Sequence, residues 1–348
     1  MRGTSVFLDH IAGRAAAALF VDGRLEDVLI DPPEDGPDPL GTIFRATVDR
    51  PVKGQGGVFL RLPDGGTGFL RQAKGLAAGQ AVLAQTTGFA EPGKAAPMTL
   101  RLLFKSRFAI VTPDAPGLNV SRRIREPERR AALKFLAEDM MEGSPFGLIL
   151  RSCAEDAPEN EIAEDIASQR ILADTILGGE ATTPERLLDG ANAHELAWRE
   201  WGEPGEVVTA QGCFAERGVF DALLEAASPE APLPGGGSLV VEPTRALVAV
   251  DVNSGGDFSP AATLKANLAA AAALPRCLRL RGLGGLVTVD FAPLSKRDRR
   301  QVEQALTRAF RADPVETSLA GWTPLGNFEL QRKRERLPLD RAVLEALQ

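Results

Sequence analysis

Two aspartates each close a short apolar run that has the composition of a buried strand. Asp251 follows Val248-Ala249-Val250, and Asp290 follows Val287-Thr288-Val289. In α/β folds, ligand-binding side chains gather where strands end, and alternation along an extended chain puts Asn253 on the same face as Asp251. Two carboxylates and an amide oxygen are hard ligands. Asp251, Asn253 and Asp290 therefore predict a Mg²⁺ or Mn²⁺ site suited to phosphodiester chemistry.

A simpler interpretation of these aspartates stays open. A carboxylate at the end of a strand often serves only as the N-cap of the helix that follows. Two observations favour the metal site. The first aspartate lies in Asp-Val-Asn-Ser-Gly-Gly, where Gly255 and Gly256 allow a ligand to approach the backbone closely. Both aspartates also lie close to a basic segment.

The charge of the chain is unevenly distributed. The 348 residues carry a net charge of −7. Residues 276–336 nevertheless hold 13 Lys/Arg against 7 Asp/Glu, a local +6, whereas residues 154–206 hold 14 acidic residues against 3 basic ones. The basic residues could form an ordinary solvated helix surface, but a phosphate backbone would account for the whole group.

The composition excludes several classes of protein. Hydrophobic residues make up 44% and charged residues 25%, which is typical of a globular chain rather than a disordered one. Two histidines exclude a histidine-cluster metal centre, and three separate cysteines without a CxxC pair predict neither disulfides nor a zinc site. No apolar stretch is long enough to cross a membrane. We therefore expect a cytoplasmic protein without a membrane segment.

The elements that must position these residues follow from the apolar pattern. Short strands every 8–12 residues between about 41 and 113, the last of them Phe108–Val111, predict a small closed barrel of the OB type. Amphipathic helices are expected at 126–141 and 163–177. Near the aspartates, Ser259-Pro260 begins an alanine-rich helix that ends at Gly282, and a further helix covers 297–311.

The segments around the aspartates resemble the catalytic region of the ribonuclease E/G family. The matching blocks are Ala249-Val250-Asp251-Val252-Asn253-Ser254-Gly255-Gly256, Lys265-Ala266-Asn267-Leu268, Leu278 to Phe291, and Leu325 to Arg334. Their order and spacing are highly specific. The resemblance implies an α/β protein of several subdomains: an OB-fold barrel inserted in an RNase H-like region, followed by a DNase I-like catalytic subdomain.

The resemblance also implies domain limits and further site residues. Phe59 and Phe69 fall where the family barrel stacks RNA bases, Lys94 where it contacts RNA, and Arg151 with Ser152 where it senses a 5′ monophosphate. Phenylalanines in a small barrel are more often core residues, so this alternative stays open. The expected domains are the N-terminal part of the RNase H-like subdomain (1–40), the barrel (41–113), the 5′-sensor-like region (114–190), the remaining RNase H-like part (191–235) and the catalytic subdomain (236–348).

The activity implied by the family is Mg²⁺-dependent cleavage of single-stranded RNA, which leaves 5′-phosphate and 3′-hydroxyl ends. Asp251 and Asp290 would hold the metal, and Asn253 would orient Asp251 or the scissile phosphate. The chain lacks the family's zinc-binding Cys-Pro-x-Cys segment, so we expect no zinc, and a homodimer would need a zinc-independent route. Two alternatives remain: an RNA-binding relative with weak turnover, and a metal-dependent phosphodiesterase that acts on DNA.

Overall fold

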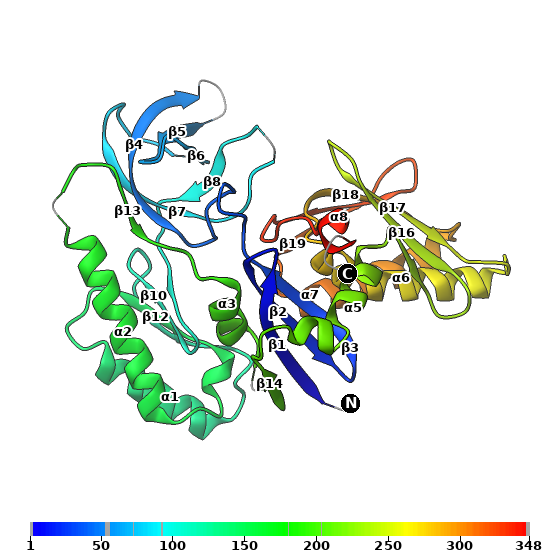
Figure 1. The fold of residues 1–348 in the computed structure, drawn as a ribbon, viewed down its shortest axis with the longest axis horizontal. Coiled ribbons are helices and arrows are strands. Elements are labelled where there is room, and N and C mark those ends of the chain that lie inside the picture. Colours follow the sequence, from blue (N-terminus) through cyan, green and yellow to red (C-terminus); the bar gives the residue numbers. More distant parts are fainter. Residues whose placement is uncertain are drawn as a thin grey trace. The chain divides into compact units, whose positions relative to one another are not determined.

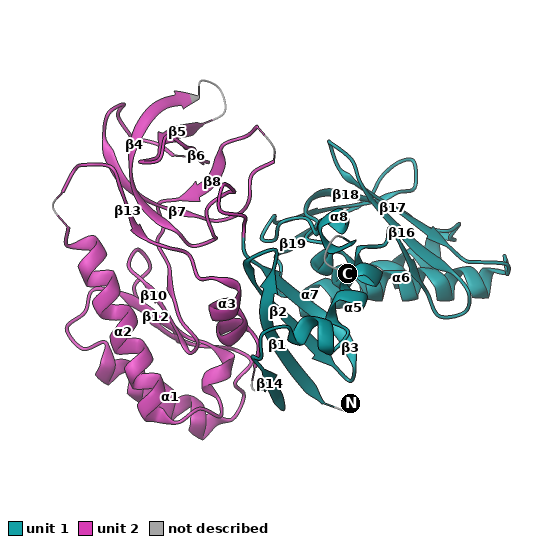
Figure 2. Ribbon diagram, in the orientation of Figure 1, with its two compact units in different colours: residues 1–31, 204–348 teal, residues 32–203 magenta. Residues whose placement is uncertain are grey.

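The chain forms two compact units, one inserted in the other. The computed structural model describes residues 3–52, 56–71, 73–91, 93–179, 181–202 and 204–345. Unit 1 comprises residues 1–31 and 204–348, and unit 2 comprises residues 32–203 (Figures 1 and 2). Each unit has its own sheets and its own apolar core.

Unit 2 begins with a closed, OB-like barrel of five strands. The strands are paired in the order β4-β5-β6-β8-β7, and β7 pairs back onto β4 to close the barrel. Alternate side chains such as Phe44, Leu60 and Met98 fill the interior. A short strand, β13 (Glu185–Leu188), adds to the outside of β4. The barrel strands are β4 (Ile43–Val52), β5 (Gly57–Arg61), β6 (Thr67–Leu70), β7 (Ala81–Thr86) and β8 (Ala96–Thr99).

The second sheet of unit 2 takes a strand that the sequence pattern assigned to the barrel. β10 (Ala109–Thr112) lies beside β12 (Gly147–Leu150), with β9 (Phe104–Lys105) and β11 (Leu118–Val120) at the edges. A short apolar run indicates a strand but not the strand that it pairs with. The sequence pattern therefore placed the end of the barrel too far along the chain.

Three helices complete the described part of unit 2. Helices α1 (Pro127–Met140) and α2 (Glu159–Leu177) pack on this second sheet through one apolar core, which confirms both expected helices. A 3₁₀ turn (Ser152–Ala154) follows β12, and a capping box at Asn192 and Glu195 begins α3 (Ala193–Glu200).

Unit 1 contains an N-terminal sheet whose strands come from both of its chain segments, residues 1–31 and 204–348. β1 (Thr4–Ile11), β2 (Arg14–Val21) and β3 (Arg24–Ile30) form an antiparallel meander, and β14 (Glu206–Val208) pairs in parallel with β1. Asp22 and Gly23 have φ values of 50° and 79°, as a type I′ hairpin turn requires. The helices α4 (Cys213–Glu216), α5 (Val219–Ala227) and α8 (Arg341–Glu345) cover its apolar face.

The second sheet of unit 1 carries the two aspartates. Its strands are ordered β15-β16-β17-β18-β20-β19, and the helices α6 (Pro260–Leu280) and α7 (Lys296–Ala312) pack on one face. Only β17 and β18 are parallel neighbours, and α6 makes the crossover between them. The strands are β15 (Glu230–Pro232), β16 (Ser238–Pro243), β17 (Val248–Asn253), β18 (Gly285–Asp290), β19 (Thr317–Trp322) and β20 (Phe328–Arg332).

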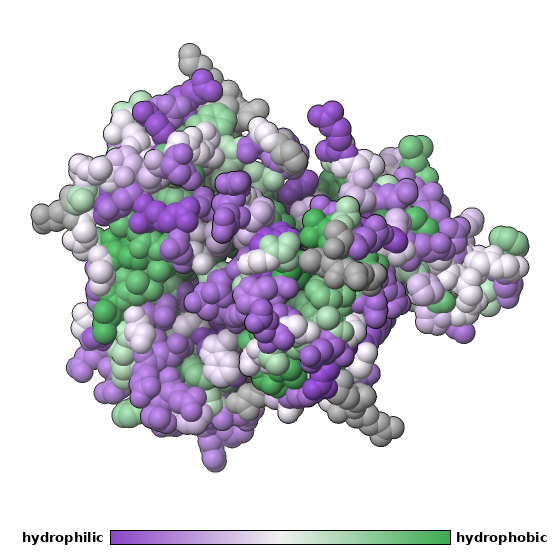
Figure 3. Space-filling model, viewed as in Figure 1, coloured by the Kyte–Doolittle hydropathy of each residue, from purple (hydrophilic) through white to green (hydrophobic). Residues whose placement is uncertain are grey.

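The surface is largely polar. In the face shown in Figure 3, hydrophilic side chains cover most of both units, and an apolar area lies on the α2 side of unit 2. Among the described residues, no helix is both long enough and apolar enough to cross a membrane.

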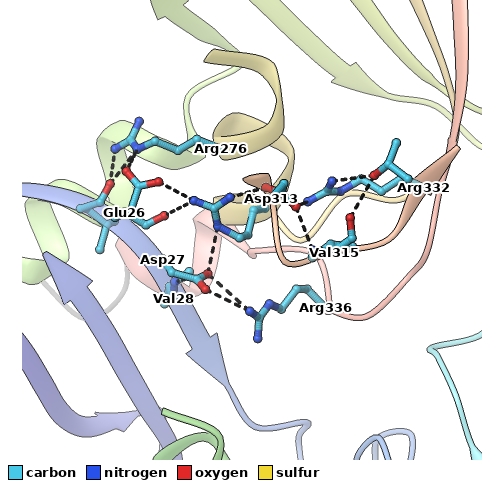
Figure 4. Close-up of polar contacts among 11 residues, drawn as sticks. Glu26, Asp27, Val28, Arg276, Asp313, Val315, Arg332 and Arg336 are labelled. Atoms are coloured by element: carbon cyan, nitrogen blue, oxygen red, sulfur yellow. Dashed lines mark hydrogen bonds and ion pairs between the residues drawn. The ribbon is translucent and has the colours of Figure 1, made fainter. Parts of the chain in front are cut away.

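A network of ion pairs joins the two sheets of unit 1 (Figure 4). Asp313 accepts hydrogen bonds from Arg279 of α6 and, at 2.9 Å, from Arg332 of β20. Arg279 also donates to the Glu26 carboxylate in β3, at 2.6 Å. The Asp313 and Arg332 side chains are each 1% exposed, and burial lowers the pKa of Arg332. The network therefore neutralises guanidinium groups that are buried or nearly buried.

The substitution Asp313→Ala should lower the free energy of unfolding by about 3 kcal/mol or more, because it leaves two buried guanidinium groups without their shared carboxylate. Urea titration followed by circular dichroism measures this change. As a control, Glu316→Ala removes an exposed ion pair with Lys333 and should cost less than about 1 kcal/mol. Equal, small effects of the two substitutions would show that the network contributes little to stability.

Candidate functional site

The two predicted aspartates are direct neighbours. β17 and β18 pair in parallel so that Asp251 lies opposite Asp290. Neighbouring strands are about 4.8 Å apart, so two side chains on the same face can share a ligand. Both aspartates are exposed, whereas Val250 and Val289 point into the core under α6 and α7. The carboxylates thus lie on the open face of the sheet.

Asn253 contacts the first of these carboxylates. Its Nδ2 donates a hydrogen bond to Asp251 Oδ2 at 2.8 Å, which leaves the amide oxygen for another partner. The end of β17 lies close to the loop that precedes β16. Gly255 has a φ of +79°, and a Cβ atom there would lie 2.4 Å from the carbonyl oxygen of Gly236. A larger residue could therefore not occupy position 255 without moving this loop.

The aspartates are not helix caps. The N-cap of α6 is Ser259, whose hydroxyl accepts from the Ala262 amide, and the N-cap of α7 is Ser295, which accepts from the Asp298 amide. The helix-cap interpretation of Asp251 and Asp290 is therefore wrong. Neither aspartate is needed to begin a helix.

A buried asparagine holds the chain that follows Asp290. The Asn267 side chain in α6 is fully buried, donates to the carbonyl of Ala292 at 2.9 Å and accepts from its amide at 3.1 Å. This two-point contact fixes the backbone two residues beyond Asp290. The sequence offered one signal for it, an asparagine within an alanine-rich helix, but the partner could not be predicted.

A third carboxylate on the same sheet face escaped the sequence analysis. Glu329 in β20 pairs with Thr288 in β18, two residues before Asp290. Its neighbours Phe328 and Leu330 are buried, so alternation places Glu329 on the open face. Only the pairing of β18 with β20, which lie about 40 residues apart, brings it there.

The donor set suits a hard divalent cation. Within the described residues, no group of three or more His, Cys, Asp or Glu side chains is arranged to hold a metal ion. Mg²⁺ does not need such a group, because it commonly uses one or two carboxylates and completes its coordination with water and substrate phosphate. Two adjacent exposed carboxylates with an amide beside one of them therefore fit this ion.

Basic residues gather at the same edge of the sheet. Helix α7 begins there, and Lys296, Arg297 and Arg300 in its first turns are exposed. Arg299 lies over the ring of Trp322 at the end of β19, with its guanidinium carbon 4.9 Å from the ring centroid. This edge thus combines the carboxylates with positive charge suited to a phosphate backbone.

The two predicted barrel phenylalanines lie side by side outside the barrel core. Phe59 in β5 pairs with Phe69 in β6, and their ring centroids are 5.2 Å apart. Both are half-buried, and the flanking residues Val58, Leu60 and Leu70 fill the core instead. The interpretation as core residues is therefore wrong. A Cβ atom at Gly57 would lie 2.3 Å from the Phe69 ring, so this glycine makes room for the pair.

Lys94 lies near the same strands. It is exposed, forms a 2.6 Å ion pair with Glu91, and precedes β8, which pairs with β6 beside Phe69. Arg50 adds a guanidinium 5.7 Å from the Phe59 ring centroid. This side of the barrel thus offers two neighbouring aromatic rings with the Arg50 guanidinium beside one of them.

Arg151 and Ser152 are adjacent at the end of β12, but Arg151 is already paired. Its Nη1 donates to the carbonyls of Ser106 and Arg199, and its Nη2 bonds Glu200. Arg199 binds the other oxygen of Glu200 at 2.7 Å. Burial opposes ionisation of Glu200, but the two guanidinium groups outweigh burial and lower the pKa of this carboxyl. An internal anion therefore lies where the sensor interpretation expects a phosphate.

The chain thus combines an OB-like barrel that carries two half-buried aromatic rings with an α/β sheet that carries paired carboxylates. The sequence model of the Ribonuclease E/G family matches residues 104–204 and 206–335. The chain belongs to this family, as its motifs predicted.

Curated relatives show the same relationship over most of the chain. Ribonuclease E of Nostoc sp. strain PCC 7120 is 28% identical over 92% of this chain and 54% of its own length. Ribonuclease G of Haemophilus influenzae is 28% identical over 77% of this chain and 62% of its own length. Ribonuclease G of Salmonella typhimurium is 30% identical over 70% and 57%. The chain therefore spans only a little over half the length of these relatives.

The substitution Glu200→Gln should increase the preference for RNA with a 5′ monophosphate over RNA with a 5′ hydroxyl, by about fivefold, or about 1 kcal/mol. The reason is that the lowered pKa keeps the Glu200 carboxylate ionised at neutral pH, where it competes with phosphate for Arg151 and Arg199. Fluorescence anisotropy with the two RNAs measures the preference. Glu161→Gln, which changes an exposed carboxylate of α2, is the control. An unchanged preference in Glu200→Gln would show that Glu200 does not compete.

Proposed function

We propose that this chain is a metal-dependent endoribonuclease that cleaves single-stranded RNA within the strand. It leaves 5′-phosphate and 3′-hydroxyl ends, uses Mg²⁺ or Mn²⁺, and acts in the cytoplasm. Membership of the Ribonuclease E/G family and the names of the curated relatives support the reaction class.

One observation carries the proposal. Asp251 and Asp290 lie in register on adjacent parallel strands, with both carboxylates exposed on the open face of the sheet. Like charges placed side by side repel each other, and neither aspartate caps a helix. A bound cation would relieve the repulsion. The arrangement is therefore better suited to a ligand than to stability.

Each residue of the candidate site has a separate role in the proposed reaction. Asp251 and Asp290 would hold the cation, and Asn253 orients the Asp251 carboxylate through their 2.8 Å hydrogen bond. The cation, when bound, supplies charge neutralisation at the phosphodiester and a more acidic water. The exposed cations at the start of α7 bind the phosphates on either side of the scissile bond. Asn267 keeps the chain after Asp290 in place.

The barrel would hold the substrate in single-stranded form. Bases of an unpaired strand stack on exposed aromatic rings, whereas a duplex keeps its bases hidden from such rings. Phe59 and Phe69 offer neighbouring rings, and Lys94 and Arg50 offer charge for the backbone. This surface favours RNA without secondary structure over duplex DNA or RNA.

Asp290→Asn and Asp251→Asn should each lower the rate of cleavage of A/U-rich, 5′-monophosphorylated single-stranded RNA by at least about 100-fold in Mg²⁺, because each removes one metal ligand. Gel analysis of a labelled RNA measures the rate, and enzymatic end-labelling identifies the new ends. Glu225→Gln removes an exposed carboxylate in α5, which covers the N-terminal sheet of unit 1, and should leave the rate unchanged.

The outcomes distinguish the proposed ribonuclease from an RNA-binding relative and from a nuclease that acts on DNA. Unmodified protein that binds this RNA without cleaving it would contradict the nuclease and support an RNA-binding relative with weak turnover. Equal cleavage by the unmodified protein and by Asp290→Asn would contradict the assignment of the site. Cleavage of single-stranded DNA at a matching rate would contradict the specificity for RNA.

Phe59→Ala should weaken binding of single-stranded RNA by about tenfold, the usual effect of losing one base-stacking ring. Phe59→Tyr keeps a ring of the same size and should bind nearly as well as the unmodified protein. Anisotropy of a labelled RNA without divalent cations measures the affinities and excludes cleavage. Full affinity of Phe59→Ala would show that the barrel rings do not bind bases.

A further inference from the structure

A tryptophan is exposed beside the paired arginines of unit 2. The side chain of Trp198, near the end of α3, is 64% exposed. A ring of this size normally contributes to a core or an interface, because burial of its apolar surface is favourable. It precedes Arg199 and Glu200 directly in the chain, so it borders the cluster around Arg151.

The exposed ring is held on one side. The guanidinium carbon of Arg107 lies 4.0 Å from the centroid of the Trp198 ring, within the range of a cation–π contact. Arg107 is only 9% exposed, and its Nη1 donates to the carbonyl of Trp198 at 2.8 Å. The same arginine contacts the ring of Phe108. One face of the tryptophan therefore rests on a fixed support, and the rest of the ring is available to solvent.

Backbone contacts place the residues beside Trp198 in contact with Arg151. Arg151 Nη1 donates to the carbonyl of Arg199 at 3.0 Å and lies 3.3 Å from that of Arg107, so it bonds the residues that flank and support Trp198. Trp198 is thus adjacent in the chain to Arg199, which together with Arg151 holds the Glu200 carboxylate. The combination matches a nucleotide, in which a flat base lies next to a phosphate.

We propose that Trp198 is a stacking platform for the 5′-terminal nucleobase of single-stranded RNA, while Arg151 and Arg199 bind the adjacent phosphate in place of Glu200. Nothing in the family motifs of the sequence pointed to this residue. The proposal rests on the proposed function, because it assumes that RNA is the ligand. It adds a base contact to a region for which only a phosphate contact was expected.

The platform is tested by removing the ring and the base separately. A 5′-phosphorylated pentaribonucleotide is compared with the same oligonucleotide lacking only its first base, on an Asp290→Asn background without divalent cations. Protein with Trp198 should bind the intact oligonucleotide about tenfold more tightly than the abasic one. Trp198→Ala should abolish this difference, and Trp198→Phe should retain part of it. The control is Phe135→Ala, which removes a ring that is 74% exposed on α1 and should keep the full difference.

The possible results are distinct. If Trp198→Ala weakens both oligonucleotides equally, or neither, the platform is overturned while RNA binding stands. If neither oligonucleotide binds any of the proteins, the proposed function fails together with the platform. Loss of the base-dependent difference in Trp198→Ala alone supports the proposal.

Discussion

The parallel pairing of β17 with β18 is the constraint on which the candidate site depends. In a strand the side chains alternate between faces, so the register that buries Val250 and Val289 also exposes Asp251 and Asp290. A slip of one residue would turn one carboxylate into the core. The apolar core therefore enforces the position of the polar site. No separate interaction is needed to bring the carboxylates together.

Helix α6 makes that pairing possible and then stabilises its surroundings. Parallel neighbours need a crossover, and α6 provides it. Its buried Asn267 holds the chain beyond Asp290, and its Arg279 joins the network around Asp313. Such a network is strongly directional, because a guanidinium group needs its donors matched in one plane. One helix thus connects the core, the site and the N-terminal sheet of unit 1.

The parts of this structure that could be predicted are those that depend on patterns among neighbouring residues. Alternation placed Asp251 and Asn253 on one face, Ser259-Pro260 marked the start of α6, and short apolar runs at regular spacing indicated the barrel. What escaped prediction depends on partners far apart in the chain. Glu200 reaches Arg151 across 49 residues, and Glu329 joins the open sheet face only through its pairing with β18. Neither position has a local pattern that reveals its partner.

The insertion of unit 2 has a consequence for synthesis of the protein. Ser5 of β1 and Glu206 of β14 pair in register although 201 residues separate them. The first three strands of the N-terminal sheet are therefore synthesised long before the fourth. β14 is made only after the whole of unit 2. Domains generally fold as units during synthesis, and a folded insertion shortens the effective loop that β1 and β14 must close. Folding of unit 2 would thus bring together the two segments of the unit that carries the carboxylates. A chain that ended within residues 32–203 would lack β14 and leave the edge of β1 unpaired.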